Sequence, residues 1–100
     1  MGNEDELVKL LSELIQINTS NPPGNESELA SFIKDWLWER GIKSEIMEYE
    51  KGRGNLISRV KGSGGASLLL LSHSDVVPAE PSRWRFPPFS GIVREGYIWG

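Results

Sequence analysis

Residues 67–78 read SLLLLSHSDVVP, and this stretch decides the expected fold. The four consecutive leucines, Leu68 to Leu71, are too few to span a membrane and lack the polar alternation of a half-exposed strand. They predict a strand buried on both faces, in the middle of an α/β sheet. His73 and Asp75 follow where this strand ends, and open α/β sheets bind ligands beyond the carboxyl ends of their strands. The sequence therefore predicts a functional site at these two residues.

His73 is the sole histidine of the chain, and it lies two residues before Asp75. In an extended backbone, residues two apart project to the same side, so the imidazole and the carboxylate are expected to lie close together. One ring nitrogen can then bind a metal while the carboxylate accepts a hydrogen bond from the other. Taken alone, however, such a pair is more often a structural hydrogen bond at a strand end. Both interpretations stay open at the level of the pair.

A longer pattern surrounds the pair: SHSDVVP is followed by Trp84, by PFSG at 88–91 and by GYIWG at 96–100. This order resembles the N-terminal part of the zinc aminoacylase, acetylornithine deacetylase, succinyl-diaminopimelate desuccinylase and glutamate carboxypeptidase family of metallohydrolases. Local departures are Pro87, where an aspartate is common, and Ser72, where a glycine is common. The resemblance implies an α/β fold: the N-terminal piece of a zinc-exopeptidase-like catalytic domain, with two helices packed on a mixed sheet.

The resemblance also implies a chemistry and a set of roles. His73 would be a metal ligand, and Asp75 would be the catalytic-site residue that holds its imidazole in place. The implied cofactor is zinc, two ions per complete site about 3.5 to 4 Å apart, with cobalt or manganese also compatible with such ligands. The implied reaction is hydrolysis of an amide bond in a small N-acyl amino acid or peptide, with a glutamate as general base.

In the resembling family the remaining ligands and the general base follow the position of Gly100. A single histidine without any cysteine cannot complete a zinc site of three or four ligands unless several carboxylates contribute. We therefore interpret residues 1–100 as an incomplete N-terminal portion of a catalytic domain, not active alone and enzymatic only when complete. A homodimer is compatible with the complete enzyme, through a dimerising domain downstream. The alternative is a non-catalytic small α/β binding module derived from this fold.

The composition gives further expectations about partners and location. The net charge of −3 and the isoelectric point near 5.1 argue against a nucleic-acid partner, which would require a basic face. No apolar run is long enough for a membrane span, and the acidic start MGNEDE does not resemble a signal peptide. The absence of cysteine is typical of a cytoplasmic protein. We therefore expect a cytoplasmic protein with no nucleic-acid or membrane partner.

Two helices are expected before the leucine run. Apolar residues recur at helical spacing over Glu4–Ile17, and the proline-rich stretch Asn18–Gly24 then predicts an irregular loop. Because this loop holds no titratable side chain, we expect it to be only a connector. Asn25, with Glu28 three residues later, predicts a capped second helix that reaches Arg40 and stops at Gly41.

Two hairpins are expected as well. Ile42–Glu50 and Asn55–Val60 flank the glycine-containing turn Lys51–Gly54, and their charged residues, Arg53 included, are predicted to lie mostly on the solvent face. Gly62–Gly65 predicts a flexible connector. A second hairpin is expected in which Ile92 and Val93 pair with Tyr97–Trp99.

Overall fold

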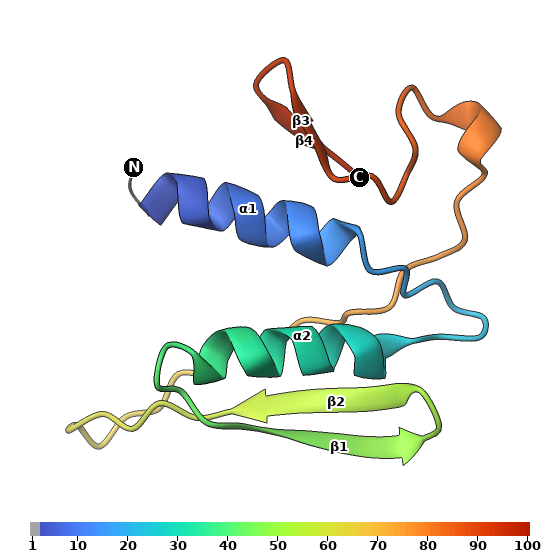
Figure 1. Ribbon diagram of the computed structural model, residues 1–100. Coiled ribbons are helices and arrows are strands. Elements are labelled where there is room, and N and C mark those ends of the chain that lie inside the picture. The colour runs from blue at the N-terminus through green and yellow to red at the C-terminus, as the bar shows by residue number, and fades with distance from the viewer. Residues whose placement is uncertain (1–2) are drawn as a thin grey trace.

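The computed structural model describes residues 3–100, and the two helices and two hairpins occur in the predicted order, without the predicted strand at the leucine run (Figure 1). The helices of this part of the chain are α1 (Asn3–Ile15) and α2 (Glu26–Trp38), with a short 3-10 turn at Pro81–Arg83. Strands β1 (Ser44–Glu50) and β2 (Arg53–Ser58) form one antiparallel pair, and β3 (Ile92–Arg94) and β4 (Tyr97–Trp99) form another. The protein is thus a small α/β structure with two helices and two small antiparallel sheets.

Helix α2 lies on the β1–β2 hairpin, and this unit holds the central packing of the described residues (Figure 1). Ile46 pairs with Leu56, and both are half-buried where the alternation of the strands turns them toward the helix. Gly54 is buried beside them: a side chain there would meet Ser27 Oγ at 2.8 Å. The absence of a side chain at position 54 lets the first turn of α2 approach the sheet, and the predicted hairpin is confirmed.

An ion pair joins the two halves of this unit. Arg53, the first residue of β2, donates from Nη2 to Glu26 Oε1 at 2.6 Å and from Nε to the same oxygen at 3.1 Å. Glu26 is the first residue of α2, and its side chain is only 8% exposed. The hydrogen bonds from Arg53 hold the pKa of the Glu26 carboxyl below its ordinary value. The prediction that Arg53 belongs to a solvent-facing set of charges is wrong, because its side chain is half-buried and paired with Glu26. This pairing could not be predicted from local spacing, because Glu26 is remote in sequence.

The β3–β4 hairpin lies beside α1 on the other side of the molecule (Figure 1). Its turn residues Glu95 and Gly96 both have positive φ, at 56° and 80°, as a two-residue turn of the primed type requires. Ser12 of α1 donates its hydroxyl to the carbonyl of Gly91 at 2.6 Å, just before β3. The predicted second hairpin is confirmed, and a single side-chain hydrogen bond fixes it to the helix.

The leucine run differs from its prediction. Leu68–Leu71 are 82–87% exposed, belong to no strand and pair with no other segment among residues 3–100. The prediction of a buried central strand in a mixed sheet is wrong for this structure, because such a strand needs neighbours on both edges and a covering layer. Apart from glycines, only Ala30 and Pro88 are buried apolar residues in the described part of the chain. The radius of gyration, 15.5 Å, exceeds the roughly 13 Å of a compact chain of this size.

The helix ends differ from the expected ones by one turn or less. Helix α1 ends at Ile15 and α2 ends at Trp38, after which the chain continues in turns to Gly41, whose φ of 76° confirms the predicted stop. Asn25 precedes α2 as predicted, but its side chain donates to the Glu28 carboxylate and caps no backbone N–H. Within residues 3–100, we find no helix that is long and apolar enough to cross a membrane.

The junction between α1 and the β3–β4 hairpin gives a stability prediction. Gly91 has a φ of 61°, and a side chain there would collide with the Ser12 carbonyl, whereas Gly96 has a similar φ and open space around it. We expect Gly96→Ala to cost about 1–2 kcal/mol for its backbone alone. Gly91→Ala should cost about 1–3 kcal/mol more, because the helix must move away. Urea denaturation of both variants measures the difference, and equal losses would show that the contact at Gly91 does not matter.

The Glu26–Arg53 pair gives a pH prediction. Because the folded-state pKa of Glu26 is lowered, its contribution to stability is present above the unfolded value near 4.5 and is lost as the pH falls through the folded value. Glu26→Gln should therefore lower stability at pH 7 by about 1–3 kcal/mol and weaken the dependence of stability on pH below about 5. Urea denaturation at stepwise pH measures both effects. An unchanged slope in the Gln variant would contradict the assignment.

Candidate functional site

The segment that carries His73 and Asp75 is held by the loop between α1 and α2. Thr19, which is 2% exposed, donates its hydroxyl to the Ser74 carbonyl at 2.7 Å. The backbone N–H of Asn21 donates to the Val76 carbonyl at 2.8 Å, and the N–H of Val76 donates to the Thr19 carbonyl at 3.2 Å. These bonds form a short parallel bridge centred on Ser20 and Val76. The loop predicted to be only a connector therefore positions the site.

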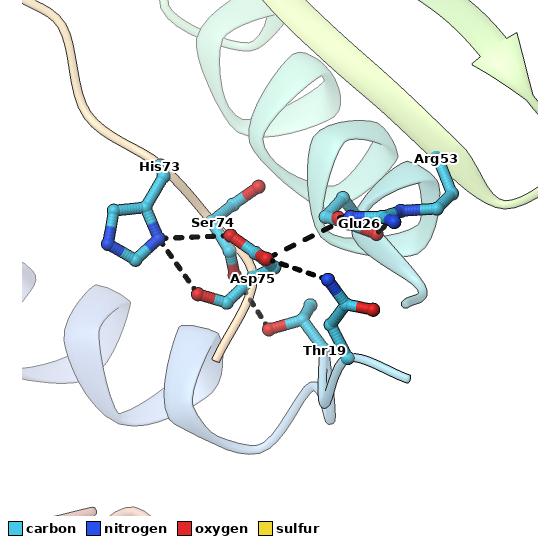
Figure 2. Close-up of polar contacts among 7 residues, drawn as sticks. Thr19, Glu26, Arg53, His73, Ser74 and Asp75 are labelled. Carbon is cyan, nitrogen blue, oxygen red and sulfur yellow. Dashed lines mark hydrogen bonds and ion pairs between the residues drawn. The ribbon is translucent and has the colours of Figure 1, made fainter. Parts of the chain in front are cut away.

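The two residues of the predicted site are brought together as expected (Figure 2). His73 Nδ1 lies 2.9 Å from the backbone carbonyl of Asp75 and 3.0 Å from Oδ1 of its carboxylate. Both of these oxygens accept hydrogen bonds, so Nδ1 must carry the proton that it shares with them. In the neutral ring Nε2 is then left with a free lone pair, on a side chain that is 85% exposed.

The carboxylate of Asp75 divides its two oxygens between different partners. Oδ1 faces His73, whereas Oδ2 accepts a hydrogen bond from the Asn21 side chain at 3.2 Å and lies 3.8 Å from Nη2 of Arg53 (Figure 2). The hydrogen bond from Asn21, followed by that from His73, lowers the pKa of Asp75 below its ordinary value. The group is therefore a carboxylate at neutral pH, able to accept a hydrogen bond from the imidazole N–H.

Three contributors to this arrangement were not predicted as site residues: Asn21, Glu26 and Arg53. Asn21 comes from the loop, Glu26 from the start of α2 and Arg53 from the start of β2, so no local spacing connects them to Asp75. The loop was predicted to be a connector because it holds no titratable side chain, and the amide of Asn21 is not titratable. The sequence beside the glycine turn does not distinguish a half-buried Arg53 from a solvent-facing one, because the difference depends on the position of α2.

The residues of this site supply only part of a metal-binding site. Among residues 3–100 no group of three or more histidine, cysteine, aspartate or glutamate side chains is close enough to hold one. The free Nε2 of His73, with a carboxylate at Nδ1, nevertheless has the donor chemistry of a zinc-binding histidine. These residues therefore fit one ligand of a zinc site and the partner that orients it, and the further ligands would have to come from elsewhere.

An apolar hollow of about 750 Å³ adjoins the bridge on the side of Ser74 and Val76. Its apolar lining comes from α1, from α2 and from residues 76–89, and includes Leu14, Leu29, Trp84 and Phe89. Glu80 and Arg83 place two charged side chains on its lining. Residues 76–89 thus border a largely apolar hollow that has Glu80 and Arg83 among its lining residues.

The sequence of this chain is similar to those of several known proteins. A probable succinyl-diaminopimelate desuccinylase of Staphylococcus aureus is 32% identical to this chain over 99 residues, which are 98% of the chain and 24% of that protein. The corresponding protein of Staphylococcus epidermidis is 33% identical over the same shares. An acetylornithine deacetylase of Vibrio atlanticus is 35% identical over 98 residues, which are 95% of this chain and 25% of the deacetylase.

No family model matches the chain. The chain spans about a quarter of the length of the curated relatives that it matches, and the matched segment includes nearly all of its residues. The likeness is not confined to one motif, because it extends over at least 95% of the chain in the three relatives described. The chain is therefore homologous, over nearly all of its own length, to a segment of the succinyl-diaminopimelate desuccinylases and acetylornithine deacetylases.

Proposed function

We propose that residues 1–100 form the N-terminal portion of the catalytic domain of a metal-dependent amidohydrolase, and that they contribute one metal ligand to its centre. The observation that carries the proposal is the orientation of His73. Its Nδ1 is held by two oxygens of Asp75, while Nε2 is exposed with its lone pair free. A ring nitrogen oriented by a carboxylate, with the other nitrogen accessible, is the arrangement of metal-binding histidines.

In this proposal His73 binds the metal through Nε2, and Asp75 fixes the tautomer and orientation of the ring. The negative charge of Asp75 also makes the imidazole a stronger electron donor. The proposed metal is zinc, and manganese or cobalt also suit a site of imidazole and carboxylates. A bound zinc ion supplies Lewis-acid polarisation of an amide carbonyl and acidifies water. The general base and the remaining ligands are proposed to come from other segments of the complete enzyme.

The proposed substrate class is a small N-acyl amino acid or peptide. The names of the relatives describe removal of a succinyl group from diaminopimelate and of an acetyl group from acetylornithine. Both reactions cleave an amide between a small acyl group and an amino acid, and this shared chemistry is what we carry over. The competing function, a non-catalytic binding module, would use the exposed leucines as a contact surface and would require no metal at His73.

The first test uses the protein made from the whole natural reading frame that contains these residues. We expect it to bind zinc and to hydrolyse N-acyl amino acids, and His73→Ala to abolish hydrolysis. Asp75→Asn should weaken zinc affinity or activity by about 10- to 100-fold, the usual effect of losing a residue that orients a ligand. Asp35→Asn, which removes an exposed carboxylate of α2, is the matched control. Zinc content and turnover unaffected by His73→Ala would support the binding-module alternative.

The 100-residue chain by itself gives a second prediction. With one oriented imidazole and no cluster of three ligands among residues 3–100, it should bind zinc only weakly and hydrolyse no acyl amino acid. Isothermal titration with zinc, compared between the natural chain and His73→Ala, measures the affinity. A nanomolar site that His73→Ala removes would contradict this prediction.

A further inference from the structure

Arg53 lies between two carboxylates from different parts of the fold (Figure 2). Its Nε and Nη2 both donate to Glu26, at 3.1 Å and 2.6 Å from Oε1. The same Nη2 is 3.8 Å from Oδ2 of Asp75, which is the oxygen that does not face His73. The guanidinium therefore contacts the site only at Oδ2 of Asp75, the oxygen that faces away from the imidazole.

The position of Arg53 is fixed by more than its charge. The side chain is 21% exposed, and a Cβ placed on Gly24 would lie 2.7 Å from both Arg53 Nε and Glu26 Oε2. The backbone N–H of Ser27 donates to the carbonyl of Gly52 at 3.0 Å, which binds the start of α2 to the turn before Arg53. Loop, helix and hairpin thus close around one guanidinium and limit how far it can move.

The division of labour at Asp75 gives this confinement a consequence. A carboxylate is planar, so fixing Oδ2 by Asn21 and Arg53 also fixes the direction in which Oδ1 points. The hydrogen bonds of Arg53 go to Glu26, so the arginine attracts Asp75 by charge at 3.8 Å without a hydrogen bond to it. Asp75 thereby keeps one oxygen available for the imidazole N–H.

We propose that Arg53, held in place by Glu26, is a positioning residue that aims the Asp75 carboxylate and thereby keeps His73 in the tautomer with the proton on Nδ1. The inference deepens the proposed function, because that tautomer presents Nε2 to a metal. It rests on the proposed function only for its purpose, since the tautomer itself exists without any metal. Neither Arg53 nor Glu26 touches the histidine, so both act through Asp75.

The test uses the fact that His73 is the sole histidine, so the ¹⁵N signals of its ring are unambiguous. They are measured by NMR on the metal-free chain at about pH 9, where an imidazole is neutral. We expect the natural protein to show the proton on Nδ1. Arg53→Met should lower the ratio of the Nδ1–H to the Nε2–H form by about twofold to fivefold, through loss of the ion pair with Asp75. The Asp75 carbonyl, which remains in every variant, limits the effect to a reduction.

The control is Arg59→Met, which removes an exposed arginine just after β2 and should leave the ratio unchanged. Arg53→Lys keeps the charge but lacks the planar fork, so an intermediate ratio is expected. If Arg53→Met fails to fold, the lysine variant decides the matter. A natural ratio in whichever of the two variants remains folded would overturn the proposal.

Failure of this inference can be told apart from failure of the proposed function. A changed tautomer in Arg53→Met, together with zinc content and turnover that do not depend on His73, would refute the metal-ligand role and leave the positioning role intact. An unchanged tautomer together with hydrolysis that requires His73 would do the reverse. The NMR measurement involves neither metal nor substrate, so each result bears on one claim only.

Discussion

The short parallel bridge between the α1–α2 loop and residues 74–76 is the constraint on which the site depends. The bonds from Thr19 and Asn21 hold the segment around His73 against the body, together with the Asp75–Arg53 ion pair. The leucines before this segment add no support, because they pair with no other segment among residues 3–100. The bridge also sets the distance between Asp75 and the start of α2. It is therefore what lets Arg53 and Glu26, which belong to the helix–hairpin unit, act on a residue outside that unit.

The Glu26–Arg53 pair has two roles that are easily confused. As a tie between α2 and β2 it stabilises the unit in which the central packing lies. As a neighbour of Asp75 it orients a carboxylate that contributes little to packing. An ion pair that serves only to stabilise the fold gains little stability from a third charged group, because bringing another carboxylate near the pair costs desolvation energy. That Asp75 nevertheless lies 3.8 Å from Nη2 of Arg53 favours a role at the site in addition to the tie.

Periodicity and turn chemistry predicted what depends on local sequence. Both helices, both hairpins, the stop at Gly41 and the closeness of His73 to Asp75 follow from spacings of a few residues. What could not be predicted depends on contacts across the fold. The burial of Glu26 needs the position of β2, and the roles of Asn21 and Thr19 need the bridge. The prediction for the leucine run failed for the opposite reason. Its composition predicts burial, but the described residues supply nothing to cover it.

That failure is itself informative about the energetics. Each leucine of Leu68–Leu71 would gain about 1.5–3 kcal/mol from full burial, and each unpaired peptide group would gain a hydrogen-bonding partner in a sheet. Any strand that paired with this run would therefore be strongly favoured. Such a strand would also lie beside the segment that leads directly into His73. The bridge at Val76 already fixes the C-terminal end of that segment. A segment that covered the leucines would thus also bring further side chains toward Nε2 of His73. The exposed leucines cost free energy in the described residues alone, but they lie where the proposed metal centre would be completed.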